Sequence, residues 1–248
     1  MHQDWNAADY AAHGGFVASL GRDVVDLLQT RPGERILDLG CGDGRLTVLL
    51  AERGAEVVGI DTSAGLLSEA AARGVDARLL DACNLSFDAE FDAVFSNAVL
   101  HWVPDIDSVL RGVHNALKRG GRFVGEFGGH GNVAAICTAL RAVAGRRGVT
   151  LALPWYFPAA EEFAERLGAT GFEVESSRLF ARPTLLPSGI TDWLRTFANG
   201  VLESLSPADR DGTLTEVASL LRPALCDSQG RWTADYVRIR FVARKPRT

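Results

Sequence analysis

The segment 36–44 constrains the fold of this chain more than any other part of the sequence. It reads Ile-Leu-Asp-Leu-Gly-Cys-Gly-Asp-Gly, an apolar strand that leads directly into a loop with glycine at positions 40, 42 and 44. A stretch that can form a helix follows over 45–53. Glycines at such a turn let the backbone bend tightly and approach a ligand closely. The segment therefore predicts a nucleoside-binding loop at the end of a strand.

The apolar pattern around this loop predicts an α/β fold. Between about 33 and 127, short runs rich in Val, Ile and Leu alternate with possible amphipathic helices, which is typical of a parallel sheet covered on both faces. The predicted strands are 35–39, 56–60, 76–80, 91–96 and 121–126. Farther on, the sequence predicts helices over 133–147 and 160–171, a strand over 172–179, mainly helix over 189–225 and an alternating, half-buried strand over 233–244.

The net charge and the cysteine content limit the kinds of partner that this chain is expected to bind. The 26 basic and 31 acidic residues give a net charge of −5, which lacks the basic character of a nucleic-acid binder. The four cysteines lie far apart without a C-x-x-C pair, and we find no signal segment, zinc-ligand spacing or long apolar run. We expect a cytoplasmic protein, monomer or homodimer, that binds a small molecule and has no nucleic-acid, membrane or metal partner.

Acidic residues around the loop distinguish between possible cofactors. Asp61 ends the next strand, where an acid can accept hydrogen bonds from ribose hydroxyls. A dinucleotide loop would need a third glycine where this chain has Arg45, and Asp38 and Asp43 would repel its pyrophosphate. A phosphate-free cofactor with a cationic sulfonium and an ammonium group would instead be attracted by these acids. These properties favour S-adenosylmethionine.

The following strand ends complete a recognisable set of motifs. Asp81 closes the third predicted strand, and the fourth runs from Phe91 into Asn97-Ala-Val-Leu-His-Trp102. With the glycine loop, this set resembles the class I S-adenosylmethionine-dependent methyltransferases, in the small-molecule branch that includes trans-aconitate methyltransferase and the malonyl-carrier-protein methyltransferase of biotin synthesis. The resemblance, carried by 33–127, implies one Rossmann-like domain: a mostly parallel seven-stranded sheet, an antiparallel last strand and a helical cap insertion. We expect an N-terminal helical lid over 1–30, the core over 31–185 and 230–248, and the cap over 186–229.

The resemblance also implies candidate cofactor residues. In that family the glycine loop lies under the methionyl group, acids after the second and third strands hold the ribose and the adenine, and the end of the fourth strand meets the methionine moiety. The matching positions in this chain are Gly40, Cys41, Gly42, Asp61, Thr62, Asp81, Ala82, Cys83 and Asn97. Asp38 is a further candidate. The alternative is that Asp38 is a buried acid that accepts hydrogen bonds from the amides of the loop. We expect the two thiols in this set to fill space and not to act as nucleophiles.

The predicted reaction moves a methyl group from S-adenosylmethionine to an oxygen, rather than a nitrogen, of a small metabolite, leaving S-adenosylhomocysteine. The acceptor is expected to be a carboxylate or a hydroxyl, and only a protonated acceptor needs a base. His101 is the candidate base, and the alternative is that it forms a cleft wall with Trp102. Two other functions stay open, an NAD-linked oxidoreductase and a non-catalytic module that binds S-adenosylmethionine.

Substrate contacts are predicted from aromatic and basic residues outside the strand ends. Tyr10 and His13 lie on one face of a possible N-terminal helix, so they could reach the cofactor and the substrate, or the helix could pack on the sheet. The candidates for the substrate wall are Trp102, Trp155, Tyr156 and Trp193. Arg182 could bind a carboxylate through both guanidinium nitrogens, with an exposed arginine at a strand end as the alternative.

Overall fold

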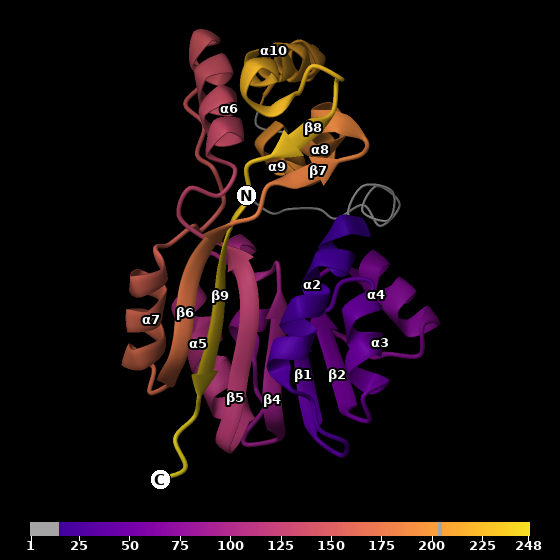
Figure 1. Cartoon of the computed structure of the whole chain (residues 1–248), viewed down its shortest axis with the longest axis vertical. Coiled ribbons are helices and arrows are strands. Elements are labelled where there is room, and N and C mark those ends of the chain that lie inside the picture. Colours follow the sequence, from indigo (N-terminus) through magenta and orange to yellow (C-terminus); the bar gives the residue numbers. More distant parts are fainter. Residues whose placement is uncertain (1–14, 203–204) are drawn as a thin grey trace.

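The computed structural model describes residues 15–202 and 205–248, and within them a seven-stranded sheet forms the centre of the molecule (Figure 1). The strands are β1 (Arg35–Leu39), β2 (Glu56–Asp61), β3 (Asp76–Leu79), β4 (Phe91–Asn97), β5 (Leu117–Gly128), β6 (Glu173–Ala181) and β9 (Val237–Arg244). Their order across the sheet is β3-β2-β1-β4-β5-β9-β6. The first five pair in parallel, and β9 runs antiparallel between β5 and β6. The predicted sheet, with its antiparallel last strand, is confirmed.

Helices cover both faces of the sheet because its central strands carry apolar side chains on both sides. In β1, Ile36 packs toward one face, whereas Leu37 and Leu39 pack toward the other. One face is covered by α2 (Gly15–Leu28) and α3 (Arg45–Ala51), and the other by α5 (Ile106–Ala116) and α7 (Ala160–Ala169). A further helix, α4 (Ala64–Ala72), packs beside β2 and β3. This packing holds the carboxyl ends of the parallel strands at one edge of the sheet.

The described part of the N-terminal helix packs mainly on the sheet. Val24, Val25 and Leu28 of α2 are fully buried against Phe95 and Val124 of the sheet. Val17, near the start of the same helix, lines the cavity described below. The predicted lid over 1–30 stays a prediction, because residues 1–14 lie outside the described part of the chain. Tyr10 and His13 lie outside the described residues.

A second hydrophobic cluster forms a cap over the carboxyl ends of the strands (Figure 1). We define the cap as α6 (Ala134–Arg146), β7 (Thr184–Leu186), α8 (Gly189–Phe197), α9 (Asn199–Leu202), α10 (Pro207–Leu225) and β8 (Trp232–Ala234). The part of the cap from β7 to β8 is inserted between β6 and β9, where the sequence analysis expected the cap. However, α6 was expected in the core over 31–185, and its buried residues Ile136, Leu140 and Val143 instead pack with α8 and α10.

The last predicted strand is interrupted where the cap joins the core. The segment 233–244 divides into β8, which pairs with β7, and β9, which enters the main sheet. Asp235 lies at the break: its Oδ2 accepts the Ala135 N–H at 2.8 Å and its carbonyl accepts the Val133 N–H at 3.0 Å. Asp235 thus forms hydrogen bonds with the start of α6 and does not pair within either strand. Among the residues that the structure describes, no helix is both long and apolar enough to cross a bilayer.

Candidate active site

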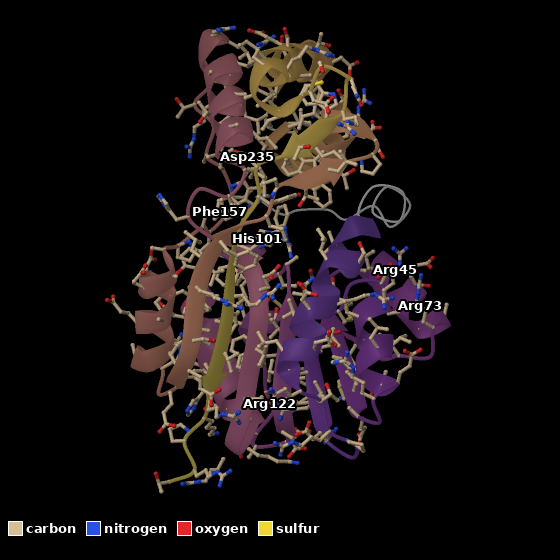
Figure 2. The ribbon with its side chains drawn as sticks, viewed as in Figure 1. Arg45, Arg73, His101, Arg122, Phe157 and Asp235 are labelled. Atoms are coloured by element: carbon tan, nitrogen blue, oxygen red, sulfur yellow. The ribbon has the colours of Figure 1, made fainter. Side chains whose placement is uncertain are left out.

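A cavity of about 320 Å³ lies between the strand ends and the cap. Figure 2 shows His101 and Phe157, which both line it, where the sheet meets the cap. Predicted site residues in its wall are Gly40, Gly42, Asp61, Thr62, Asp81, Ala82, Cys83, Asn97, His101, Trp102, Trp155 and Trp193. Most of the predicted site residues therefore lie around one cavity.

The glycine loop forms the floor of the cavity. Gly40 has a φ of +78°, and a Cβ at this position would lie only 2.2 Å from Cγ2 of Val99. Gly42 has a φ of +56°, and a Cβ there would meet no atom of the described residues within 4 Å. The first glycine thus permits a close approach of the β1 and β4 loops, and the second leaves open space beside the backbone.

The acids at the ends of β2 and β3 are fixed by backbone hydrogen bonds. Asp61 accepts the Gly42 N–H on Oδ2 at 3.0 Å and the Ser63 N–H on Oδ1 at 2.9 Å, and burial raises its pKa. Asp81 accepts the Cys83 N–H on Oδ1 at 2.9 Å. Each carboxylate oxygen has more than one acceptor position, so these acids retain the capacity to accept ligand hydroxyl or amino groups.

Two predicted cofactor residues lie outside the cavity wall. Asp38 is almost fully buried, and its Oδ2 accepts the Thr47 hydroxyl at 2.6 Å instead of loop amides; burial raises its pKa to about 7. The thiol of Cys41 packs over Gly59, where an added Cβ would lie 2.8 Å from Sγ. Burial raises the pKa of this thiol well above its ordinary value, so the side chain fills space and is not a reactive thiolate.

Two predicted substrate residues are also directed elsewhere. The Tyr156 hydroxyl donates to Oε1 of Glu162 at 3.3 Å, and the ring lies outside the cavity wall. Arg182 forms an ion pair with the buried carboxylate of Glu126. Arg182 is thus neither the free carboxylate ligand nor the exposed strand-end arginine that the sequence suggested, because its counterion comes from β5, far away in the sequence.

His101 is buried in the cavity wall with its Nδ1 engaged. The Gly128 N–H donates to Nδ1 at 3.3 Å, so the neutral ring carries its proton on Nε2. Burial, and secondarily the charge of Arg238, lowers its pKa well below the ordinary value. The ring centroid lies 5.2 Å from that of Trp102 and 5.8 Å from that of Phe157. His101 is therefore a neutral hydrogen-bond donor within an aromatic wall.

Arg238 is a wall residue that the sequence analysis missed. It is the second residue of β9 and has only 4% of its surface exposed, and its guanidinium lies 4.3 Å from the ring centroid of Tyr236. The alternating pattern of 233–244 predicted a half-buried strand and did not single out this arginine. Arg238 is buried because β9 lies inside the sheet and its start lies beneath the cap. The sequence did contain one indication of this location. Arg238 lies at the start of a strand expected to be antiparallel, and the start of such a strand lies beside the carboxyl ends of the parallel strands.

Comparisons with known proteins agree with this architecture. A family model for the methyltransferase domain matches residues 37–125. Over 97% of this chain and 98% of the relative, the sequence is 36% identical to the uncharacterized methyltransferase C70.08c of Schizosaccharomyces pombe. The chain belongs to the S-adenosylmethionine-dependent methyltransferase family. This membership confirms the resemblance stated above and replaces the NAD-linked alternative.

Two further comparisons bear on the family branch and the fold. A trans-aconitate 2-methyltransferase of Methylobacterium nodulans is 30% identical to this chain, and the match covers 98% of this chain and 99% of the relative. The solved structure of the Haemonchus contortus phosphoethanolamine N-methyltransferase 2, in complex with phosphomonomethylethanolamine and S-adenosylhomocysteine, has a TM-score of 0.62. It is 21% identical, and the match covers 97% of this chain and 57% of that chain. The seven-stranded sheet is thus shared with a distant methyltransferase.

The strand ends of this methyltransferase fit S-adenosylmethionine, its methyl donor. The open space beside Gly42 admits a ligand close to the backbone, and Asp61 and Asp81 hold fixed acceptor oxygens around the same cavity. These features suit a nucleoside with free ribose hydroxyls and an exocyclic amino group.

Proposed function

We propose that this methyltransferase transfers the methyl group to a carboxylate oxygen of a small acid. The observation that carries the proposal is the engaged Nδ1 of His101, which leaves a protonated Nε2 and therefore no basic nitrogen to remove a proton from an acceptor. A hydroxyl or ammonium acceptor must lose a proton during methylation. A carboxylate is already ionised at neutral pH and needs only to be positioned.

Other titratable residues of the wall offer no obvious replacement base. Asp61 and Asp81 accept backbone N–H groups at the strand ends, on the side assigned to the cofactor. Burial raises the pKa of the Cys83 thiol to about 11, so it is protonated at neutral pH. The described residues that line the cavity thus include no evident base, and this favours an acceptor that is already ionised when it binds.

In this proposal each part of the cavity has a role in positioning or in excluding water. Asp61 with Thr62 holds the ribose, and Asp81 with Ala82 and Cys83 holds the adenine. Gly40, Gly42 and Asn97 adjoin the methionyl group. S-adenosylmethionine supplies a methyl group on a cationic sulfonium. Trp102, Trp155 and Trp193 enclose the acceptor, and exclusion of water strengthens electrostatic interactions within the site. The relative named for trans-aconitate, a carboxylic acid, supports the same acceptor class.

A matched panel of acceptors tests the proposed function. Purified protein and S-adenosylmethionine are incubated with small carboxylic acids and with the alcohols and amines of the same carbon skeletons, and the products are identified by mass spectrometry. We expect methyl esters from acids and no methyl ethers or methylamines. Methylation of the alcohols or amines, with the acids unreacted, would overturn the proposal.

Replacing His101 by glutamine is expected to have a small effect on the turnover of an acid. A glutamine can accept the Gly128 N–H and donate into the cavity, so kcat should fall less than about 10-fold, whereas loss of a general base costs about 10²- to 10⁴-fold. In the wild-type protein, kcat should be flat between about pH 6 and pH 9 because burial holds the pKa of His101 well below its ordinary value, so the ring stays neutral over this range. A 100-fold or greater loss together with the disappearance of an acidic limb would identify His101 as a base.

Replacing Asp61 by asparagine is expected to weaken binding of S-adenosylhomocysteine about 10- to 100-fold, the range for losing a hydrogen bond to a charged group. An asparagine has one acceptor oxygen, so its amide nitrogen would face either the Gly42 or the Ser63 N–H. Calorimetric titration measures the change. Asp76→Asn, an exposed substitution at the start of β3, is the control and should bind normally. Equal affinities of the two variants would remove Asp61 from the cofactor site.

A further inference from the structure

Arg238 places a buried positive charge in the cavity wall, and this charge forms no ion pair with the residues that the structure describes. Its Nε and Nη1 have no hydrogen-bond partner among the described residues. Burial lowers the pKa of the guanidinium to about 10, so it is still cationic at neutral pH. Keeping an unpaired charge away from water is costly, and proteins normally pair such a group or place it where a ligand pairs with it.

The acidic residue whose charge acts on Arg238, Glu126, is already engaged by other arginines. Glu126, on β5, forms an ion pair with Arg182, and its Oε2 accepts from Nε of Arg240 at 2.8 Å and lies 2.7 Å from Nη2 of the same side chain. Its side chain is 1% exposed. Three arginines thus surround one carboxylate, and Arg238 is the one of the three that lines the cavity. The local balance of charge leaves a positive charge for a ligand to neutralise.

The neighbours of Arg238 hold its guanidinium in place without neutralising it. The Tyr236 ring stacks against it, and the Tyr236 hydroxyl accepts the indole N–H of Trp193 at 2.6 Å. The ring is therefore fixed to α8 of the cap. Arg238 is also close enough to His101 for its charge to lower the pKa of that ring. A planar guanidinium beside a neutral imidazole N–H donor is suited to a carboxylate.

The strand order sets the distance of Arg238 from the cofactor side of the cavity. Arg238 pairs with Gly128 at the end of β5, and β5 separates β9 from β4, whose last residue is Asn97. Two strand spacings correspond to about 10 Å. The backbone of Arg238 thus lies about 10 Å, across β5, from the end of β4, where the proposed cofactor residue Asn97 lies. This separation leaves room for a small acid between Arg238 and the proposed cofactor residues.

We infer that Arg238 binds a second carboxylate of the substrate, one that is not methylated, so that the acceptor is an acid with two or more carboxylates. This inference rests on the proposed function and deepens it. The carboxylate bound by Arg238 neutralises the buried charge and orients the molecule with its other carboxylate toward the strand ends. Arg238 is thus a residue that determines specificity, and it takes no part in the displacement.

The test compares two acids of the same shape. Fumarate carries a carboxylate at both ends of a trans four-carbon chain, and crotonate has a methyl group in place of one of them. The kcat and KM for esterification of both are measured for the wild-type protein, Arg238→Met, Arg238→Lys and the control Arg195→Met. Arg195 is exposed on the cap, so the control removes one positive charge without changing the cavity. Affinity for S-adenosylhomocysteine, measured by calorimetry, reports whether each variant is folded.

Arg238→Met should raise the KM for fumarate about 10- to 100-fold and leave that for crotonate within about twofold, because the lost interaction is a charge-assisted pair made by fumarate alone. Arg238→Lys should fall between wild type and Arg238→Met, since it keeps the charge but loses the planar fork. S-adenosylhomocysteine affinity and the control variant should be unchanged. Equal losses for the two acids, or no loss for fumarate, would overturn the inference and leave carboxylate methylation intact. If the wild-type protein esterifies neither acid nor trans-aconitate, the proposed function itself fails.

Discussion

Replacing Gly40 by alanine is expected to lower the free energy of unfolding by about 2–5 kcal/mol, the sum of a left-handed backbone penalty and overpacking. The φ of +78° disfavours any side chain, and the new Cβ would approach Cβ of Val99 to 2.9 Å and its Cγ2 to 2.2 Å. Because the clash reaches the β carbon, a rotation of the valine side chain cannot remove it. The loops after β1 and β4 must then separate, which also disrupts the cofactor side of the cavity.

Gly74→Ala is the matched control for this substitution. Gly74 has a φ of +81°, and an added Cβ would meet nothing within 4 Å, so its cost should be the backbone penalty of about 1–2 kcal/mol alone. Chemical denaturation of both variants separates the two contributions. Adding Val99→Ala to the Gly40→Ala variant should recover part of the loss, since the two positions are in contact. If Gly40→Ala were no less stable than Gly74→Ala, the close approach of the two loops would be incorrect.

The buried Asp38 is expected to make the stability of the apoprotein fall as pH rises. Burial raises its pKa from 3.8 to about 7, so the folded state favours the protonated carboxyl. This contribution is fully present below the unfolded value of 3.8 and is lost as pH rises through about 7. The difference between the two values corresponds to up to about 4 kcal/mol.

Asp38→Asn tests this dependence because asparagine stays neutral and its oxygen can still accept the Thr47 hydroxyl. Relative to wild type, the variant should gain stability between about pH 4 and pH 8, by up to about 4 kcal/mol. The exposed substitution Asp88→Asn serves as the control for loss of one carboxylate and should show little change. A stability difference between Asp38→Asn and wild type that is the same at both pH values would contradict the burial of an uncharged Asp38.

The positions of the proposed cofactor residues were predictable because their geometry is local. Gly40, Gly42, Asp61 and Asp81 each lie at the end of a short apolar strand, and the carboxyl ends of parallel strands meet at one edge of a sheet. Once the strands were recognised by their apolar runs, the positions of these residues followed. The strand bounds differ from prediction by a few residues, and β5 differs most because it begins at Leu117, before the expected 121.

The substrate side was poorly predictable because it depends on contacts between distant segments. Whether Arg182 or Arg238 is free to bind a ligand depends on which of them reaches Glu126, and no local pattern contains that information. The helix α6 is a similar case. It follows β5 in the sequence, as a helix that covers the core would, but its apolar face packs against the cap helices that begin about 50 residues later. Tertiary packing decides both cases.

The chemical stability of the methylated product tests the central claim most directly. The protein is incubated with methyl-labelled S-adenosylmethionine and the acid that it turns over fastest, and the isolated product is treated with mild alkali. A methyl ester releases its label as methanol, and the account predicts complete release. Label that stays attached to the product after this treatment, as in a methyl ether or a methylamine, would contradict methylation of a carboxylate.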